Sequence, residues 1–397
     1  MHAVVLIVVL FLTLVANADD LALQEIVNAN NRFASSLYKT IHLSSNRNFA
    51  ISPFSAGAAF ALIQSGCKGR TADEIRTALH LPNNKNAIEA GFKTLLPTLK
   101  GNGFYTFHFV TKVYGKKNLP FKKTFKTVAK QVYLATTESI DFSKRAKAAK
   151  TINKWVEKNT KNKIKNMVSA SSFGSGTGMV VLNAFYLQAN WSNPFPPLSA
   201  RTLFYKNLDN EIFVDTLLQN EAHLYNLYES VELNARFLEL PFQGGEVSMV
   251  IALPNAKNGL GNLENQIEKV LEPQPFVVEN VVVVVPKFKT ETRGYLKNIL
   301  QAMGVNAPFE KKTADLSDAA GKKGSLFVNN VLQKVYFKVE EGGIDAASST
   351  ATNTERSASP AAFLPTKEFI ADHPFIYYVK VKDLIVCIGR VLDPTQQ

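Results

Sequence analysis

Cysteine is nearly absent from this chain, which has only Cys67 and Cys387 among its 397 residues. Two cysteines cannot supply the disulfide framework that many small secreted domains need, and a chain of this length can bury a large core without one. Cys67 follows an expected helix, and Cys387 lies in the strand-like run LIVCIGRV. We therefore expect both residues to be buried free thiols.

Signatures of common catalytic and metal sites are also missing. The six histidines do not show the spacing of metal ligands, and no Gly-x-Ser-x-Gly sequence occurs. The run GSGTG at residues 174–178 lacks the spacing of a dinucleotide-binding loop and is typical of a turn. We expect no metal, no required cofactor and no enzymatic activity.

Acidic residues are outnumbered, since 33 Asp and Glu face 45 Lys and Arg, for a net charge of +12. Residues 112–165 alone contain sixteen basic and three acidic residues, so this region carries the whole excess. The basic residues with helical or adjacent spacing are Lys116, Lys117, Lys122, Lys123, Lys126, Lys130, Lys147, Lys150, Lys154 and Lys158. This concentration predicts a site for a heparin-like glycosaminoglycan or an anionic lipid surface, rather than nucleic acid. A solvated helix face is the alternative.

The chain has no apolar run of membrane-spanning length. Residues 3–16 are apolar, but this run is shorter than the roughly twenty residues that a span requires. Ala16 and Ala18 suit cleavage after Ala18, which predicts a signal peptide over residues 1–18, a secreted, extracellular protein and a single domain over residues 19–397. An uncleaved anchor helix is the alternative. Asn190 begins the one N-glycosylation sequon and is the expected glycosylation site.

Hydrophobic periodicity predicts an α+β fold without repeats or an interdomain linker. We expect helices at residues 21–44, from Ser52-Pro53 onward, 71–79, 122–133, 148–164 and 291–303. We expect strands at residues 104–115, 179–191, 235–242, 247–254, 276–289 and 331–339, and strand structure within residues 367–391, including LIVCIGRV at 384–391. Thr71 and Glu74 have the spacing of a capping box at the start of the third helix.

Large and charged side chains are scarce in one long segment between two expected strands. Thirteen of the twenty-one residues from 343 to 363 are Ala, Ser or Thr, too small to hold a packed position of their own. Alternating small residues can nevertheless become a strand. Arg356 is the only basic residue between Val339 and Lys367. This composition predicts a bait loop that can change its conformation.

A series of motifs along nearly the whole chain, residues 22–395, resembles the serpins, a family of protease inhibitors. The motifs are NFAISPFS (48–55), INKWVEKNT (152–160), LNAFYLQANW (182–191), LELPF (238–242), SMVIALP (248–254), VPKFK (285–289), ADLS (314–317), EEGGIDAASST (340–350) and ADHPFIYYV (371–379). The resemblance implies a serpin fold with three β-sheets, eight or nine helices and an exposed reactive loop at about residues 341–364. It also implies suicide inhibition, in which the cleaved loop inserts into the central sheet while the protease is covalently trapped.

The resemblance assigns functional residues by motif. The hinge comprises Glu341, Gly343, Ile344, Ala346, Ala347, Ser348 and Thr350, and the sheet-opening cluster comprises Ser52, Ser55, Asn183 and Gln333. The chain departs from the family's usual pattern at Gln333, where many members have His, and at Ile344, where Thr or Ser is usual. The expected reactive bond is Arg356-Ser357, because a trypsin-like protease needs a cation for its acidic specificity pocket. Cleavage after Ser357, or later at Phe363-Leu364, stays open.

The chain is similar to secreted arthropod members of the family, including the salivary anticoagulant kind directed at clotting proteases such as factor Xa. The expected partner is therefore a trypsin-like serine protease in blood coagulation or another cascade, with heparin as a possible activator. We expect a monomer. A non-inhibitory serpin that acts as a carrier or binding protein is the alternative function.

Overall fold

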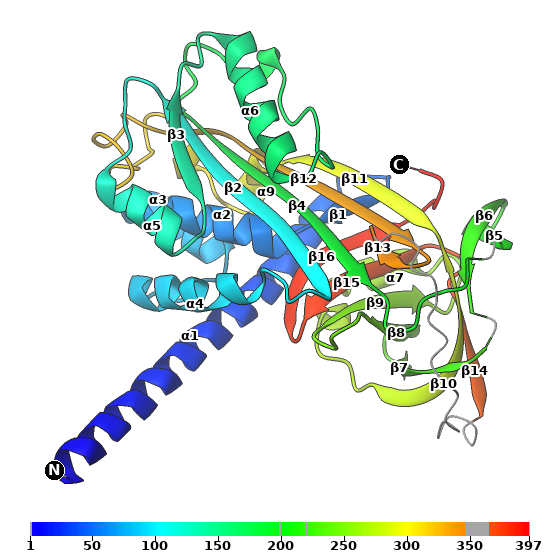
Figure 1. The fold of residues 1–397 in the computed structure, drawn as a ribbon. Helices are drawn as coiled ribbons and strands as arrows, with labels where there is room; N and C mark the ends of the chain where they lie inside the picture. Colours follow the sequence, from blue (N-terminus) through cyan, green and yellow to red (C-terminus); the bar gives the residue numbers. More distant parts are fainter. Residues whose placement is uncertain (1, 198–199, 220, 346–364, 397) are drawn as a thin grey trace.

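The computed structural model describes residues 2–197, 200–219, 221–345 and 365–396 (Figure 1). This part of the chain contains nine α-helices and two β-sheets, which confirms the α+β class. The helices are α1 (His2–His42), α2 (Pro53–Ser65), α3 (Gly69–Ala78), α4 (Lys85–Thr98), α5 (Lys123–Gln131), α6 (Arg145–Asn159), α7 (Leu260–Glu264), α8 (Ile267–Val270) and α9 (Leu296–Ala302).

The larger sheet has ten strands in the order β1-β16-β15-β9-β8-β7-β10-β6-β5, and β14 also pairs with β10. These strands are β1 (Phe49–Ile51), β5 (Ala200–Asn207), β6 (Asn210–Leu218), β7 (His223–Ser230), β8 (Ala235–Pro241), β9 (Val247–Pro254), β10 (Val277–Pro286), β14 (Thr366–Ile370), β15 (Phe375–Val381) and β16 (Leu384–Val391). Strand β10 pairs with β7 through its first half and with β6 through its end. It therefore joins the two ends of the ten-stranded sheet.

The smaller sheet has six strands in the order β11-β12-β13-β4-β2-β3. These strands are β2 (Tyr105–Lys116), β3 (Thr136–Ile140), β4 (Met179–Asn190), β11 (Phe288–Tyr295), β12 (Val328–Glu340) and β13 (Gly343–Ile344). All but two of the twelve residues in β4 are buried, so both faces of this strand are covered. Its nearly continuous apolar sequence follows from that position.

Apolar side chains fill both faces of the six-stranded sheet. The main core lies between this sheet, the ten-stranded sheet and helices that include α1 and α2. A second cluster lies on the opposite face, where Ile152 and Val156 of α6 pack with Leu182 of β4 and Leu332 of β12. Figure 1 shows α6 and α2 on opposite sides of these strands. Helix α6 therefore covers the strands that any change in this sheet would have to move.

Helix α2 begins at the residues that sequence analysis indicated. Ser52 is the N-cap, its hydroxyl accepts a hydrogen bond from the Ser55 amide at 3.2 Å, and Pro53 occupies the first turn. The helix is buried on nearly all sides, and Gly57 faces the Phe33 ring, which a methyl group on the glycine would meet at 3.7 Å. This packing fixes Ser52 and Ser55 beneath the six-stranded sheet.

Two local predictions were wrong. Residues 291–295 belong to strand β11, and the expected helix begins only at Leu296, because eight residues of β11 pair with β12. Thr71 does not cap α3, which begins at Gly69. Its hydroxyl instead accepts from the Asp315 amide at 3.0 Å, which ties the helix to the segment beside it.

Helix α1 begins at His2, well before the expected start at residue 21, and its N-terminal part projects from the body in Figure 1. No helix in the described ranges combines the length and the apolar character that a membrane span requires. Cys67 and Cys387 are free and buried, as expected, and burial raises the pKa of both thiols.

Candidate functional site

The centre of the six-stranded sheet contains a seam between the parallel strands β4 and β12. Eight residue pairs close this seam, from Val328 opposite Met179 to Tyr336 opposite Tyr186. Beyond these pairs the two strands separate, and β13 lies between them. Ile344 of β13 is antiparallel to Val339 on one side and to Ala189 on the other. The seam is therefore occupied by a short strand at one end and closed at the other.

A longer strand could extend this arrangement. Each residue added to β13 along the seam would exchange one β4–β12 pair for two antiparallel pairs, one with each neighbour. The chain that continues from β13 is the small-residue segment. The geometry thus allows strand addition within the sheet, although the hinge residues Ala346, Ala347, Ser348 and Thr350 lie outside the described residues.

Two of the three remaining hinge residues sit in close contact with the sheet. Gly343 has φ +147°, and a methyl group added to its Cα would lie 1.9 Å from the Ala189 carbonyl oxygen, so only glycine fits there. Ile344 is fully buried. β13 is therefore integrated into the sheet at both of its residues.

Glu341 is held by an ion pair with Lys287, which follows β10. Partial burial raises the pKa of the Glu341 carboxyl, but the hydrogen bond and charge of Lys287, a backbone hydrogen bond and the charge of Lys338 together bring the pKa below its ordinary value. The backbone carbonyls of the residues before and after Glu341 also accept hydrogen bonds. The Trp191 indole N–H donates to the Glu340 carbonyl at 3.0 Å, and the Trp191 backbone N–H donates to the Gly342 carbonyl at 2.9 Å. Lys287 was not predicted as a partner of Glu341, although it lies in the motif at 285–289.

Asp345 ends the described part of the hinge. Its carboxylate is 5% exposed and lies 2.7 Å from the Lys163 ammonium, in the segment that follows α6. The Gln188 amide of β4 donates to the same carboxylate at 3.3 Å. Asp345 has φ +47°, an uncommon conformation for a residue with a side chain. These contacts attach the end of β13 to the segment after α6 and to β4.

The four residues of the expected sheet-opening cluster meet beneath the seam. The Gln333 amide donates to Asn183 Oδ1 at 2.8 Å and to the Ser52 carbonyl at 2.9 Å, and Ser55 Oγ donates to Asn183 Oδ1 at 2.7 Å. All four are at most 2% exposed. Because Gln333 and Asn183 are register partners, their hydrogen bond crosses the seam itself.

One member of this network was missed. Thr111 of β2 accepts a hydrogen bond from the Asn183 amide at 3.0 Å and so links a third strand to the cluster. No pattern in the sequence marks this threonine, because its role depends on the pairing of β2 with β4, in which Thr111 lies opposite Asn183.

Arg356 and Ser357, together with the alternative bond at Phe363-Leu364, lie outside the described residues. The flanking elements are described: β13 ends in the six-stranded sheet, and β14 begins at Thr366 in the ten-stranded sheet. The segment with the expected reactive bond therefore connects the two sheets.

The ten expected polyanion-binding lysines lie on three elements. Lys116 ends β2 and Lys117 follows it; Lys122, Lys123, Lys126 and Lys130 lie at or on α5, and Lys147, Lys150, Lys154 and Lys158 on α6. All except the half-buried Lys116 are exposed. Within the described ranges, none has a carboxylate at ion-pair distance, unlike Lys112 of the same region, which pairs with Glu138 at 2.6 Å. Their charge is thus available at the surface.

Asn190, the expected glycosylation site, is the last residue of β4 and is half-buried. It lies opposite Gly343, and its backbone carbonyl accepts a hydrogen bond from the backbone N–H of Gln243 at 2.9 Å. Glycosylation there remains a prediction. No group of three or more His, Cys, Asp or Glu side chains in the described residues is arranged to hold a metal ion.

Comparison with known proteins agrees with this geometry. The family model described as "Serpin (serine protease inhibitor)" matches residues 28–394. The chain is 31% identical to the leukocyte elastase inhibitor of Homo sapiens, over 94% of this chain and 100% of that protein. It is 30% identical to the antitrypsin of Bombyx mori, over 92% and 93%. Serpin48 of the insect Tenebrio molitor, a solved structure, is 39% identical, with a TM-score of 0.87 over 93% and 98% of the two chains. The expected fold is confirmed.

Proposed function

Because the chain belongs to the serpin family, we propose that it is a secreted suicide inhibitor of trypsin-like serine proteases. In this proposal the protease cleaves the segment between β13 and β14, and the freed segment extends β13 along the seam while the protease is still covalently attached. Insertion must outpace hydrolysis of that covalent bond, since water alone would release an active protease.

The observation that carries the proposal is the position of β13. Its two residues already pair with both β12 and β4, in the antiparallel direction that an inserted strand would continue. The residues that follow are small and, apart from Asp345, Glu355 and Arg356, uncharged up to residue 363. Inserting them would therefore bury few groups that are costly to desolvate.

The proposed target class rests on Arg356, the lone cation of the segment, and on likeness to a relative named antitrypsin. Incubation with trypsin should yield a product of summed mass that survives a denaturing gel. Arg356→Ala should abolish this product, whereas Lys367→Ala, at the nearest basic residue beyond the segment, should leave it intact. An undiminished product with Arg356→Ala would mean that another bond, such as the one after Ser357 or Phe363, is used.

Secretion, glycan modulation and a cascade role complete the proposal. Secretion is supported by the short apolar run at residues 3–16 and the small residues before Asp19. Binding of heparin-like polyanions is supported by the exposed lysines on α5 and α6. An anticoagulant or other protease-regulating role would follow from a trypsin-like target. N-terminal sequencing of the secreted protein tests the first point, because it should begin at Asp19.

A non-inhibitory binding protein is the second candidate, and one cavity favours it. This cavity of about 910 Å³ lies between α1, the segment after α8 and strands β15 and β16, with Arg32, Gln274 and Tyr378 in its wall. Its volume falls within the range of small-molecule sites. Cleavage by trypsin without a covalent product would favour this function over inhibition.

A further inference from the structure

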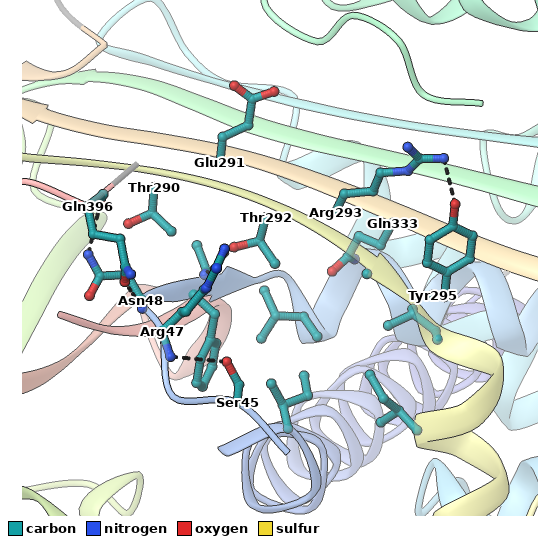
Figure 2. Close-up of a pocket in the computed structure, with 17 residues that line it drawn as sticks. Ser45, Arg47, Asn48, Thr290, Glu291, Thr292, Arg293, Tyr295, Gln333 and Gln396 are labelled. Carbon is teal, nitrogen blue, oxygen red and sulfur yellow. Dashed lines mark hydrogen bonds between the residues drawn. The ribbon is translucent and has the colours of Figure 1, made fainter. Parts of the chain in front are cut away.

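A second cavity, of about 400 Å³, lies beside strand β11 of the six-stranded sheet (Figure 2). It is enclosed by the end of α1 and the loop after it, strand β1, strand β11 and helix α9. Ile41, Ile51, Leu296 and Ile299 contribute apolar surface, and Thr292, Asn48 and Gln396 contribute polar groups. A pocket of this size and mixed lining suits a small amphiphilic molecule.

The mouth of the cavity is positively charged. Arg47 extends toward Thr292 in Figure 2, and no carboxylate of the described residues lies at ion-pair distance from its guanidinium. Arg293 donates to the Tyr295 hydroxyl at 2.7 Å and likewise has no acidic partner in the part of the chain described. The one acid of the lining, Glu291, points away from the cavity and pairs with Lys334. An anionic group would therefore meet a cation that no acid of the described residues neutralises.

The backbone of the loop that carries Arg47 is held in place by Arg390. Arg390 is 4% exposed, and its guanidinium donates to the Arg47 carbonyl at 3.2 Å and to the Ser45 carbonyl. The same guanidinium pairs with the buried Glu264 carboxylate at 2.6 Å. Arg47 is thus presented by an ordered loop, which lowers the entropic cost of binding.

The inner end of the cavity reaches Gln333. This residue donates across the seam to Asn183, and its side-chain oxygen accepts from the Ser52 amide at 3.2 Å. A molecule in the cavity would contact β1 and β11 on the side of the seam that carries Gln333. A molecule bound in the cavity would therefore lie next to Gln333, one of the residues that must separate when the seam opens.

We propose that this cavity binds a small amphiphilic carboxylate, with its anionic end at Arg47 and its apolar chain against Ile51, Leu296 and Ile299, and that the bound molecule stabilises the closed seam. The binding part stands on the cavity alone. The regulatory part rests on the proposed inhibitory function, because it concerns the competition between loop insertion and hydrolysis.

Decanoate is a suitable probe, with decanol and decyltrimethylammonium as neutral and cationic controls of the same chain length. Decanoate should raise the melting temperature of the uncleaved protein saturably, by about 2 °C at roughly tenfold excess over its Kd. Arg47→Gln should weaken this binding about tenfold or more, because a charge-assisted hydrogen bond is lost. Arg32→Gln is the matched control, since Arg32 also projects from the α1 region but lines the other cavity.

Equal shifts with decanol or the cation, or full retention of the decanoate shift in Arg47→Gln, would overturn the proposal. Loss of the shift in Arg32→Gln instead would place binding in the other cavity and overturn it as well. The regulatory part predicts that decanoate raises the number of inhibitor molecules consumed per trypsin molecule trapped, and an unchanged number would contradict that part. If the protein traps no protease at all, the proposed function fails, while the thermal measurement still decides the binding site.

Discussion

The Lys163 ammonium and the Asp345 carboxylate lie 2.7 Å apart, although the two residues are 182 positions apart in the chain. Lys163 belongs to the segment between α6 and β4, and Asp345 directly follows β13. This ion pair joins the segment after α6 to the hinge. It also balances a carboxylate that is only 5% exposed.

Lys163→Met should destabilise the uncleaved protein by about 1–3 kcal/mol, because the Asp345 carboxylate keeps its burial but loses its cation. Asp345→Asn retains the shape and should cost less. In the double variant the side chain at position 345 is neutral and no longer needs a cation, so the combined loss should be smaller than the sum of the two single losses. Urea unfolding of the four proteins measures this, and strictly additive losses would show that the pair does not act as a unit.

Gln333→Leu should destabilise the uncleaved protein more than the cleaved one. In the uncleaved protein the change removes the hydrogen bond to Asn183 across the seam and also the bonds to the Ser52 backbone, and each buried group left without its partner costs about 1–3 kcal/mol. In a cleaved protein with an inserted strand, Gln333 and Asn183 are no longer neighbours, so only the loss at Ser52 applies.

Melting temperatures of both forms, with Gln131→Leu at the exposed end of α5 as the control, test this relation. Similar losses in the uncleaved and cleaved forms would contradict the assignment of Gln333 to the seam.

Sequence patterns predicted the structural features that depend on neighbouring residues or on a family motif. The N-cap at Ser52, the buried strands β4 and β9 and the members of the sheet-opening cluster could all be named from the sequence, because each depends on nearby residues or on a quoted motif. Strand β11 could be named only at its first two residues, which end the expected strand at 276–289. Its sequence ETRGY at 291–295 has no strand-like alternation of apolar residues, and only its pairing with β12 makes it a strand.

Contacts between distant segments were likewise beyond sequence analysis. Thr111 joins the cluster because β2 pairs with β4 in a register that places it opposite Asn183. Lys287 contacts Glu341 because the end of β10 lies near the start of β13. Thr71 has the spacing of a cap but lies within the first turn of its helix, where its hydroxyl binds the 313–315 segment. In each case tertiary packing decides which of several locally possible partners is used.

His108 should make the protein less stable in mild acid. Its ring stacks on Tyr186 at 4.1 Å; burial, followed by the positive charge of Lys161, lowers its pKa to about 4, despite the opposing effect of Asp345. The ordinary histidine pKa of about 6.5 applies to the unfolded chain. Between these values the unfolded state binds more protons, so stability falls as the pH decreases from about 6.5 to about 4.

His108→Gln should therefore flatten this part of the pH profile of the melting temperature. Part of the slope should persist, because burial also lowers the pKa of His80 and His223. An unchanged slope in His108→Gln would show that this histidine does not contribute.

Replacing Lys122, Lys123 and Lys126 together with Gln should weaken binding to heparin. Each lost contact lowers the slope of log affinity against log salt by about 0.7–0.9, so the three replacements should lower it by about 2 to 3. A triple replacement at the exposed Lys311, Lys312 and Lys323 removes the same net charge elsewhere and should leave the slope nearly unchanged. Equal effects of the two triple variants would indicate a response to net charge alone, and the α5 site would then be wrong.

Trapping by loop insertion is the central claim, and Ala346→Arg tests it most directly. If Ile344 is followed along the seam by inward-facing residues at every second position, residue 346 enters the core, where an unpaired arginine costs several kcal/mol. After incubation with trypsin, a denaturing gel should show a covalent complex for the parent protein, and for Ala346→Arg only the cleaved inhibitor with free protease. Equal amounts of complex from both proteins would contradict insertion of this segment into the sheet.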